Sequence, residues 1–208
     1  MRTRIMLLLP VVFLLSILAS AQDKSPVKFG KVSVADFETK NLGVDTAEGA
    51  VIIADIGSSA FEGNTDGWFS LIYKVHRRVL ILNNKGFDLA SVEIPLYMSS
   101  KNQKEEKLDK LKAYTYNLEN GKVVETKLSD DAVFKEKKSK NWLVRKFTMP
   151  AVKAGSIIEY SYTVESDFLF NLQPWTFQGS YPRIWSEYKV EMPSFFEYVS
   201  ILSGLQEI

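Results

Sequence analysis

The sequence predicts an all-β protein, an antiparallel β-sandwich with one or two short helices near the start of the mature chain. Two observations support this fold class. Short segments alternate between apolar and polar residues, which is typical of strands with one buried face. Turn residues such as glycine and asparagine separate these segments, and such spacing favours an antiparallel sandwich over a parallel sheet linked by helices.

The clearest alternation lies in two segments, 142–149 and 156–164. In the second segment, every other residue from position 158 onward is apolar or aromatic, as expected for a half-buried strand. Gly155, between the segments, can adopt the positive φ that a chain reversal needs. We therefore expect a hairpin in which Lys146 faces Glu159, an exposed cross-strand pair worth roughly 0.2–1 kcal/mol.

The first 21 residues have the features of a secretory signal peptide. Arg2 and Arg4 give a positive start, an apolar run follows, and Ala19-Ser20-Ala21 is a small-residue cleavage site. A membrane anchor is the alternative, but the apolar run is shorter than the roughly 20 residues that span a bilayer. We expect cleavage after Ala21, no membrane span in the mature chain, and an exported protein that is periplasmic or extracellular.

Residues 22–49 are predicted to form an N-terminal arm with short helical turns, the first of them capped by Ser33. The β-sandwich domain is expected to span residues 50–208 and to be incomplete at its C-terminus. Its first strand is predicted at 50–56, where the residues are apolar and β-branched, and the sequence Gly-Ser-Ser at 57–59 is expected to end it.

Further strands are predicted at 68–82, 88–97 and 185–192, and a second hairpin at 111–128. The hairpin prediction rests on Asn120-Gly121, because both central positions of a type I′ turn need positive φ. A two-residue loop also sets the register, which pairs Glu119 with Lys122, Leu118 with Val123 and Tyr116 with Glu125.

The composition excludes several chemistries. The chain has 26 lysines and arginines against 25 acidic residues, and a near-neutral balance argues against nucleic acid as the main partner. The absence of cysteine excludes disulfide frameworks, thiol catalysis and cysteine–zinc sites. No glycine-rich phosphate loop occurs. We predict no cofactor, no metal site and no catalytic residue in this chain.

His76 is the single histidine, so any Ser–His–Asp triad would have to use it. Its neighbours in sequence include Lys74, Arg77 and Arg78, which do not orient an imidazole as an acidic residue would. We therefore predict a solvated strand histidine. Acid–base catalysis of glycoside hydrolysis by two distant carboxylates stays open, although nothing in the sequence selects a pair.

The segment from 167 to 192 is rich in aromatic residues, and Trp175, Tyr181 and Trp185 are the candidate binding surface. Aromatic side chains give a large contact area with few rotatable bonds. These three could stack on sugar rings or hold a neighbouring domain. The alternative, which we favour, is that they close the core of the sandwich.

Several segments together resemble a domain of unknown function that precedes the transglutaminase-like core in exported bacterial envelope proteins. The resemblance extends roughly from Val51 to the end of the chain. It is carried by the runs LKAYTYNLENGK (111–122), PAVKAGSIIEY (150–160) and RVLILNNKGF (78–87), and by Trp175, Phe177, Pro182 and Ser186-Glu187-Tyr188.

This resemblance implies a β-sandwich outside the cytoplasm with a non-catalytic role beside a papain-like domain. That domain would use Cys, His and Asp, and since this chain has no cysteine, no family catalytic residue can be assigned here. The expected function is an accessory or interaction module whose partner is a downstream transglutaminase-like domain or another envelope protein. The alternative is a carbohydrate-binding module that holds a glycan with its surface aromatics.

Overall fold

The structure is a computed structural model that describes residues 25–45 and 47–195. The signal peptide predicted at 1–21 lies outside the described residues, as do residues 196–208 of the predicted sandwich domain. Within the described part of the chain, no helix is long and apolar enough to cross a membrane.

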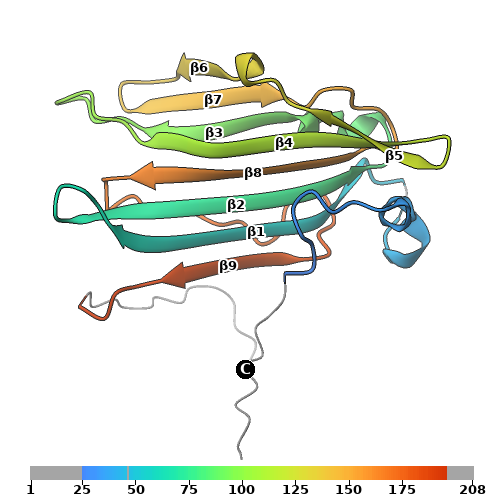
Figure 1. Cartoon of the computed structure of the whole chain (residues 1–208), viewed down its shortest axis with the longest axis horizontal. Helices are drawn as coiled ribbons and strands as arrows, with labels where there is room; N and C mark the ends of the chain where they lie inside the picture. The colour runs from blue at the N-terminus through green and yellow to red at the C-terminus, as the bar shows by residue number, and fades with distance from the viewer. Residues whose placement is uncertain (1–24, 46, 196–208) are drawn as a thin grey trace, which may run out of the picture.

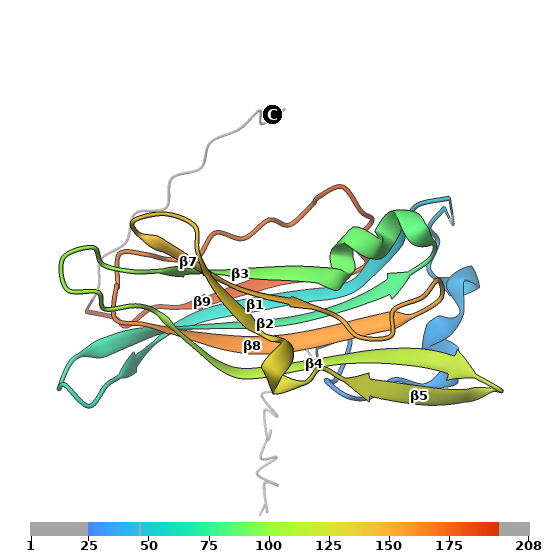
Figure 2. The same ribbon diagram turned by 90° about the horizontal axis from the view of Figure 1, so that it is seen from above.

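Two sheets pack face to face, as the sequence predicts for a β-sandwich (Figures 1 and 2). The larger sheet has the strand order β5-β4-β8-β2-β1-β9. The smaller has the order β3-β7-β6. The strands of the larger sheet are β1 (Ala50–Gly63), β2 (Phe69–Ile81), β4 (Lys107–Glu119), β5 (Lys122–Lys127), β8 (Ile157–Ser166) and β9 (Ser186–Glu191). Those of the smaller sheet are β3 (Ser91–Tyr97), β6 (Phe134–Lys137) and β7 (Trp142–Thr148).

The helical content of the described residues consists of short 3-10 turns. Two of them, η1 (Val34–Phe37) and η2 (Thr39–Asn41), lie in the N-terminal arm, where short helices were predicted. The others are η3 (Asn84–Ala90) and η4 (Asp130–Ala132). Neighbouring strands are antiparallel except at one edge, where β9 runs parallel to β1. The predicted all-β sandwich is therefore confirmed, with one parallel edge strand added.

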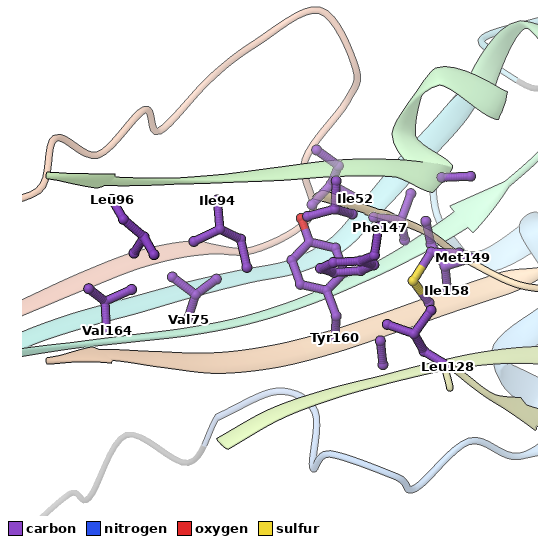
Figure 3. Close-up of a cluster of buried hydrophobic side chains, with 14 of the residues drawn as sticks. Ile52, Val75, Ile94, Leu96, Leu128, Phe147, Met149, Ile158, Tyr160 and Val164 are labelled. Carbon is purple, nitrogen blue, oxygen red and sulfur yellow. The ribbon is translucent and has the colours of Figure 1, made fainter. Parts of the chain in front are cut away.

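The main hydrophobic core lies between the two sheets (Figure 3). Ile94 and Leu96 of β3 point toward Val75 and Val164 of the larger sheet. Burying an aliphatic side chain of this kind contributes about 1.5–3 kcal/mol. We call the face of the larger sheet that contacts this core its inner face, and the opposite one its outer face.

The predicted hairpin at Asn120-Gly121 is correct in both position and register. Strands β4 and β5 pair Glu119 with Lys122, Leu118 with Val123 and Tyr116 with Glu125. Asn120 and Gly121 have φ values of 49° and 74°. These are the positive values that a type I′ turn requires.

The other predicted hairpin, between 142–149 and 156–164, is wrong. Strand β7 pairs with β3 and β6 in the smaller sheet, whereas β8 pairs with β2 and β4 in the larger one. The connection therefore crosses from one sheet to the other. Lys146 lies opposite Glu93 and contacts Glu136, at 2.5 Å, instead of facing Glu159.

The alternation of both strands was nevertheless interpreted correctly, because each strand has one face in the core. The rings of Phe147 on β7 and Tyr160 on β8 meet across the core with their centroids 6.1 Å apart. A period of two fixes which face of a strand is buried, but it does not fix which sheet the strand joins.

The first strand is longer than predicted, because Gly57-Ser58-Ser59 does not end it. Strand β1 continues to Gly63 and is paired through this segment with β2 on one side and β9 on the other. Backbone pairing on both sides outweighs the weak strand preference of glycine and serine.

Candidate interaction site

Trp175, the first residue of the predicted binding surface, is half-buried on the inner side of the larger sheet. Its ring stacks on Tyr188 of β9 with a centroid distance of 5.2 Å and an angle of 10°. A Cβ atom on Gly57 would lie 2.4 Å from the same ring. Glycine at position 57 therefore makes room for the indole, which packs against the main core.

Tyr181 and Trp185 point to different surroundings. The Tyr181 hydroxyl lies 2.6 Å from Asp88 Oδ1 and 2.8 Å from the Lys85 carbonyl oxygen, and the bond to Asp88 raises the pKa of Tyr181 to about 12. Trp185 is 37% exposed, and its Nε1–H donates to Glu187. Glu187 and Tyr188 are adjacent in β9 and point to opposite faces. The three predicted aromatics therefore do not form one surface, and the two tryptophans do not share a groove that could hold a sugar.

A buried charge cluster fastens this aromatic-rich segment to the sheet. Asp55 on β1 is fully buried and accepts two hydrogen bonds of 2.8 Å from Arg77 on β2. Arg183, which precedes β9, donates to the same carboxylate, and Arg77 also donates to the Tyr160 hydroxyl at 3.1 Å. Local sequence does not reveal this cluster, because Asp55 lies in a segment that is otherwise apolar.

A larger aromatic surface, which the sequence analysis did not predict, covers one end of the sandwich. Tyr97, at the end of β3, has its ring centroid 4.7 Å from that of Phe168 and 5.7 Å from those of Trp142 and Phe170. Phe170 is 76% exposed, so this group of rings reaches the solvent.

A second group of rings lies at the turn between β1 and β2. Phe69 contacts Trp68 and Phe195, with centroid distances of 5.7 and 5.1 Å. Trp68 and Phe195 are each 61% exposed.

Both groups belong to the same end of the molecule. Leu71 pairs with Ser166, and the Ser70 hydroxyl donates to Asp167 at 2.6 Å, so the start of β2 lies beside the end of β8. The β1–β2 turn and the ends of β3, β8 and β9 lie together at the left of Figure 1. We call this surface the aromatic end and define it as Trp68, Phe69, Tyr97, Trp142, Phe168, Phe170 and Phe195.

Comparison with protein families decides what kind of domain this is. Residues 69–200 match DUF3857, a domain of unknown function with a solved structure. The chain belongs to the DUF3857 family. The resemblance to a domain of unknown function is therefore confirmed, and it includes six of the seven residues of the aromatic end.

The other comparisons show weaker similarity for this DUF3857 chain, or none. No curated protein matches it significantly. A crystal structure described as a "putative protease" from Parabacteroides distasonis ATCC 8503 aligns at 16% identity with a TM-score of 0.42. The alignment covers 57% of this chain and 23% of that one, so the DUF3857 chain matches less than a quarter of that protein.

His76 is not the solvated residue that the sequence predicted. Its Nε2 lies 2.7 Å from Glu159 Oε1, its side chain is 18% exposed, and Phe29 of the N-terminal arm packs on its ring at 5.4 Å. The N-terminal arm covers this part of the outer face. The sequence neighbours of His76 are cationic, but the acidic partner comes from the adjacent strand β8, which local sequence does not reveal.

Glu159 is the centre of this buried network. Arg78 donates to its Oε1 through Nε and Nη2, at 3.0 and 2.8 Å, and the Gly30 N–H and the Tyr116 hydroxyl lie 2.9 and 3.3 Å from its Oε2. Burial alone would raise the pKa of Glu159. The hydrogen bonds from His76 and Gly30 and the Arg78 charge outweigh burial and hold this pKa below its usual range.

This network holds the arm on the sheet, because its hydrogen-bond donors already bond to its acceptor, the Glu159 carboxylate. The hydrogen-bonded partner of the His76 ring is Glu159, and no serine or threonine hydroxyl among the described residues bonds to it. In the same part of the chain, no group of three or more His, Cys, Asp or Glu side chains is arranged to hold a metal ion. The aromatic end is therefore the strongest candidate site for an interaction.

Proposed function

We propose that this DUF3857 chain is a non-catalytic accessory module of an exported, transglutaminase-like protein, and that the aromatic end docks on the polypeptide that follows Phe195. The observation that carries this proposal is the exposure of several large rings at one end of the sandwich. Contiguous exposed apolar surface rimmed by polar residues is typical of protein–protein contacts.

The path of the chain supports the proposal that the aromatic end docks on the polypeptide that follows Phe195. After β9 the chain arrives at the aromatic end, where the ring of Phe195 packs on Phe69 at 5.1 Å. Phe195, the last described residue, therefore lies at this surface. The resemblance of the sequence to domains that precede a transglutaminase-like core supports this choice of partner.

A binding experiment tests the docking. The mature chain from Gln22 is titrated with the polypeptide encoded directly downstream in the same reading frame, and the Kd is measured by calorimetry. The double variant Trp142→Ser/Phe170→Ser removes two exposed rings and is expected to weaken binding roughly 30-fold or more, as for loss of an interface hot spot. Unchanged binding would refute the docking proposal.

Phe134 offers a matched control. It is 65% exposed on β6, and it pairs with Lys146 at the opposite end of β7 from Trp142. Phe134→Ser removes an exposed ring outside the aromatic end and should leave the Kd unchanged. Circular dichroism of all variants separates loss of binding from loss of fold.

The other parts of the proposal have their own measurements. Sequencing of the mature N-terminus from the exported fraction should begin at Gln22, and retention of the full chain in the cytoplasm would contradict export. Hydrolysis of a peptide or a glycan by the purified chain would contradict a non-catalytic role if a substitution in this chain abolished that hydrolysis.

A further inference from the structure

The outer face of the larger sheet carries a basic groove beside the part that the N-terminal arm covers. The groove has a volume of about 350 Å³. Lys74 and His76 of β2 and Lys110 and Lys112 of β4 line it, and none of its described lining residues is acidic. Lys74 has one acidic neighbour outside the groove, Glu62 at 3.6 Å, whereas Lys110 and Lys112 form no ion pair within the described chain.

A β-bulge brings both of these unpaired lysines to the groove. The pairing of β4 with β8 shifts between Asp109 and Lys112, and Lys110 has a φ of 53°. Strict alternation would place Lys110 and Lys112 on the same face as Leu108, which packs against the core. The bulge changes the alternation, so Leu111 packs against the core while both lysines line the groove.

The other lining residues are Ile56, Gly57, Val75 and Tyr162, together with Ser58, Ser161 and Thr163, whose short side chains carry hydroxyl groups. None of these three hydroxyl groups has a hydrogen-bond partner among the described residues. Thr163 is 8% exposed and lines the groove. Unpartnered donors thus lie beside unpaired cations in one concave site.

We propose that this groove is a binding site for the oxyanion of a small ligand, a phosphate or the carboxylate of an acidic sugar. Lysine ammonium groups and hydroxyls are suitable donors for such oxygens, and charge-assisted hydrogen bonds are the stronger kind. A cleft lined by one sign of charge also concentrates ligands of the opposite sign. The volume lies at the small end of the range for ligand pockets, about 300–1,000 Å³. This site lies outside the aromatic end and does not depend on the docking proposed there.

The test is an NMR titration of the mature chain with inorganic phosphate, with D-glucuronate and with D-glucose. We expect saturable shifts of the backbone amides at 110–112 and 161–163 with one or both anions and none with glucose. Raising the ionic strength should weaken the binding, because salt screens exposed charges. A response to phosphate alone assigns the site to phosphate groups, and a response to glucuronate assigns it to acidic sugars.

Variants locate the binding. Lys110→Gln/Lys112→Gln should weaken it about tenfold or more through the loss of charged donors. Thr163→Val keeps the charge and the shape and should weaken binding about threefold. Lys122→Gln/Lys127→Gln changes the net charge equally on the neighbouring strand β5 and should have no effect. Full affinity in the first double variant, equal loss in the control, or equal binding of glucose and glucuronate would each overturn the proposal.

Discussion

The buried carboxylate of Glu159 gives a sharp test of how the N-terminal arm is held on the sheet. It is fully buried and accepts hydrogen bonds from Arg78, His76 and the Gly30 N–H. Glu159→Gln keeps the shape of the side chain but removes the charge that pairs with Arg78, which is itself only 2% exposed. Removing one partner of a buried ion pair costs about 3–5 kcal/mol, because the other charge remains buried and unpaired.

We therefore expect Glu159→Gln to lower the free energy of unfolding in urea by about 3–5 kcal/mol. For a domain of this size the Tm should fall on the order of 10 °C. The amide of Gly30 should exchange faster with solvent, because its acceptor is weakened. Glu165→Gln is the matched control, since Glu165 lies on the same face of the same strand and forms no ion pair with the described residues. Its effect should stay within about 0.5 kcal/mol.

A loss below about 1 kcal/mol in Glu159→Gln, or unchanged exchange at Gly30, would refute this account of the arm. The dependence on pH gives an independent check. Because the pKa of Glu159 is lower in the folded than in the unfolded state, its charge stabilises the fold fully above the unfolded pKa. This contribution disappears as the pH falls through the folded pKa. The stability difference between the wild type and Glu159→Gln should therefore shrink on acidification, and a constant difference would contradict the lowered pKa.

Two further substitutions test the attachment of the aromatic-rich segment. Gly57→Ala places a Cβ atom 2.4 Å from the Trp175 ring, so it should cost about 1–3 kcal/mol in urea unfolding and change the tryptophan fluorescence. Unchanged stability would mean that the indole can move aside. Asp55→Asn leaves the Arg77 and Arg183 guanidinium groups without their carboxylate, so it should cost about 3–5 kcal/mol and expose the segment before β9 to proteolysis. Resistance equal to that of the wild type would argue against the anchoring role of this cluster.

The sequence predicted the Asn120-Gly121 turn and the buried face of each main strand, because both depend on residues that are close together in sequence. The hairpin at Asn120-Gly121 follows from the positive φ that its turn needs, and its register follows from the two-residue loop. The face of each main strand follows from alternation with a period of two. The crossing between β7 and β8 could not be predicted in this way, since both a hairpin and a crossing bury the same faces.

The candidate sites depended on contacts between segments that are distant in sequence. Trp68 directly precedes β2 and Trp142 begins β7, and only the packing of the two sheets brings both to the aromatic end. Alternation placed Glu159 on a solvent face, because it takes no account of the arm that covers that face. The aromatic cluster between 167 and 192 was visible from composition, but its members divide between the core and the surface.

Strand β8 explains why the two proposed sites can act independently. Its outer-facing residues pass from Glu159, under the arm, to Thr163, in the basic groove, and the strand then leads to Phe168 at the aromatic end. Thr163 lies within β8, whereas Phe168 lies beyond its end at Ser166. The groove opens through the outer face, whereas the aromatic end lies at the tip of the sandwich. A partner docked at the tip, as proposed, would therefore leave the groove accessible, and we expect an anion in the groove not to compete with it.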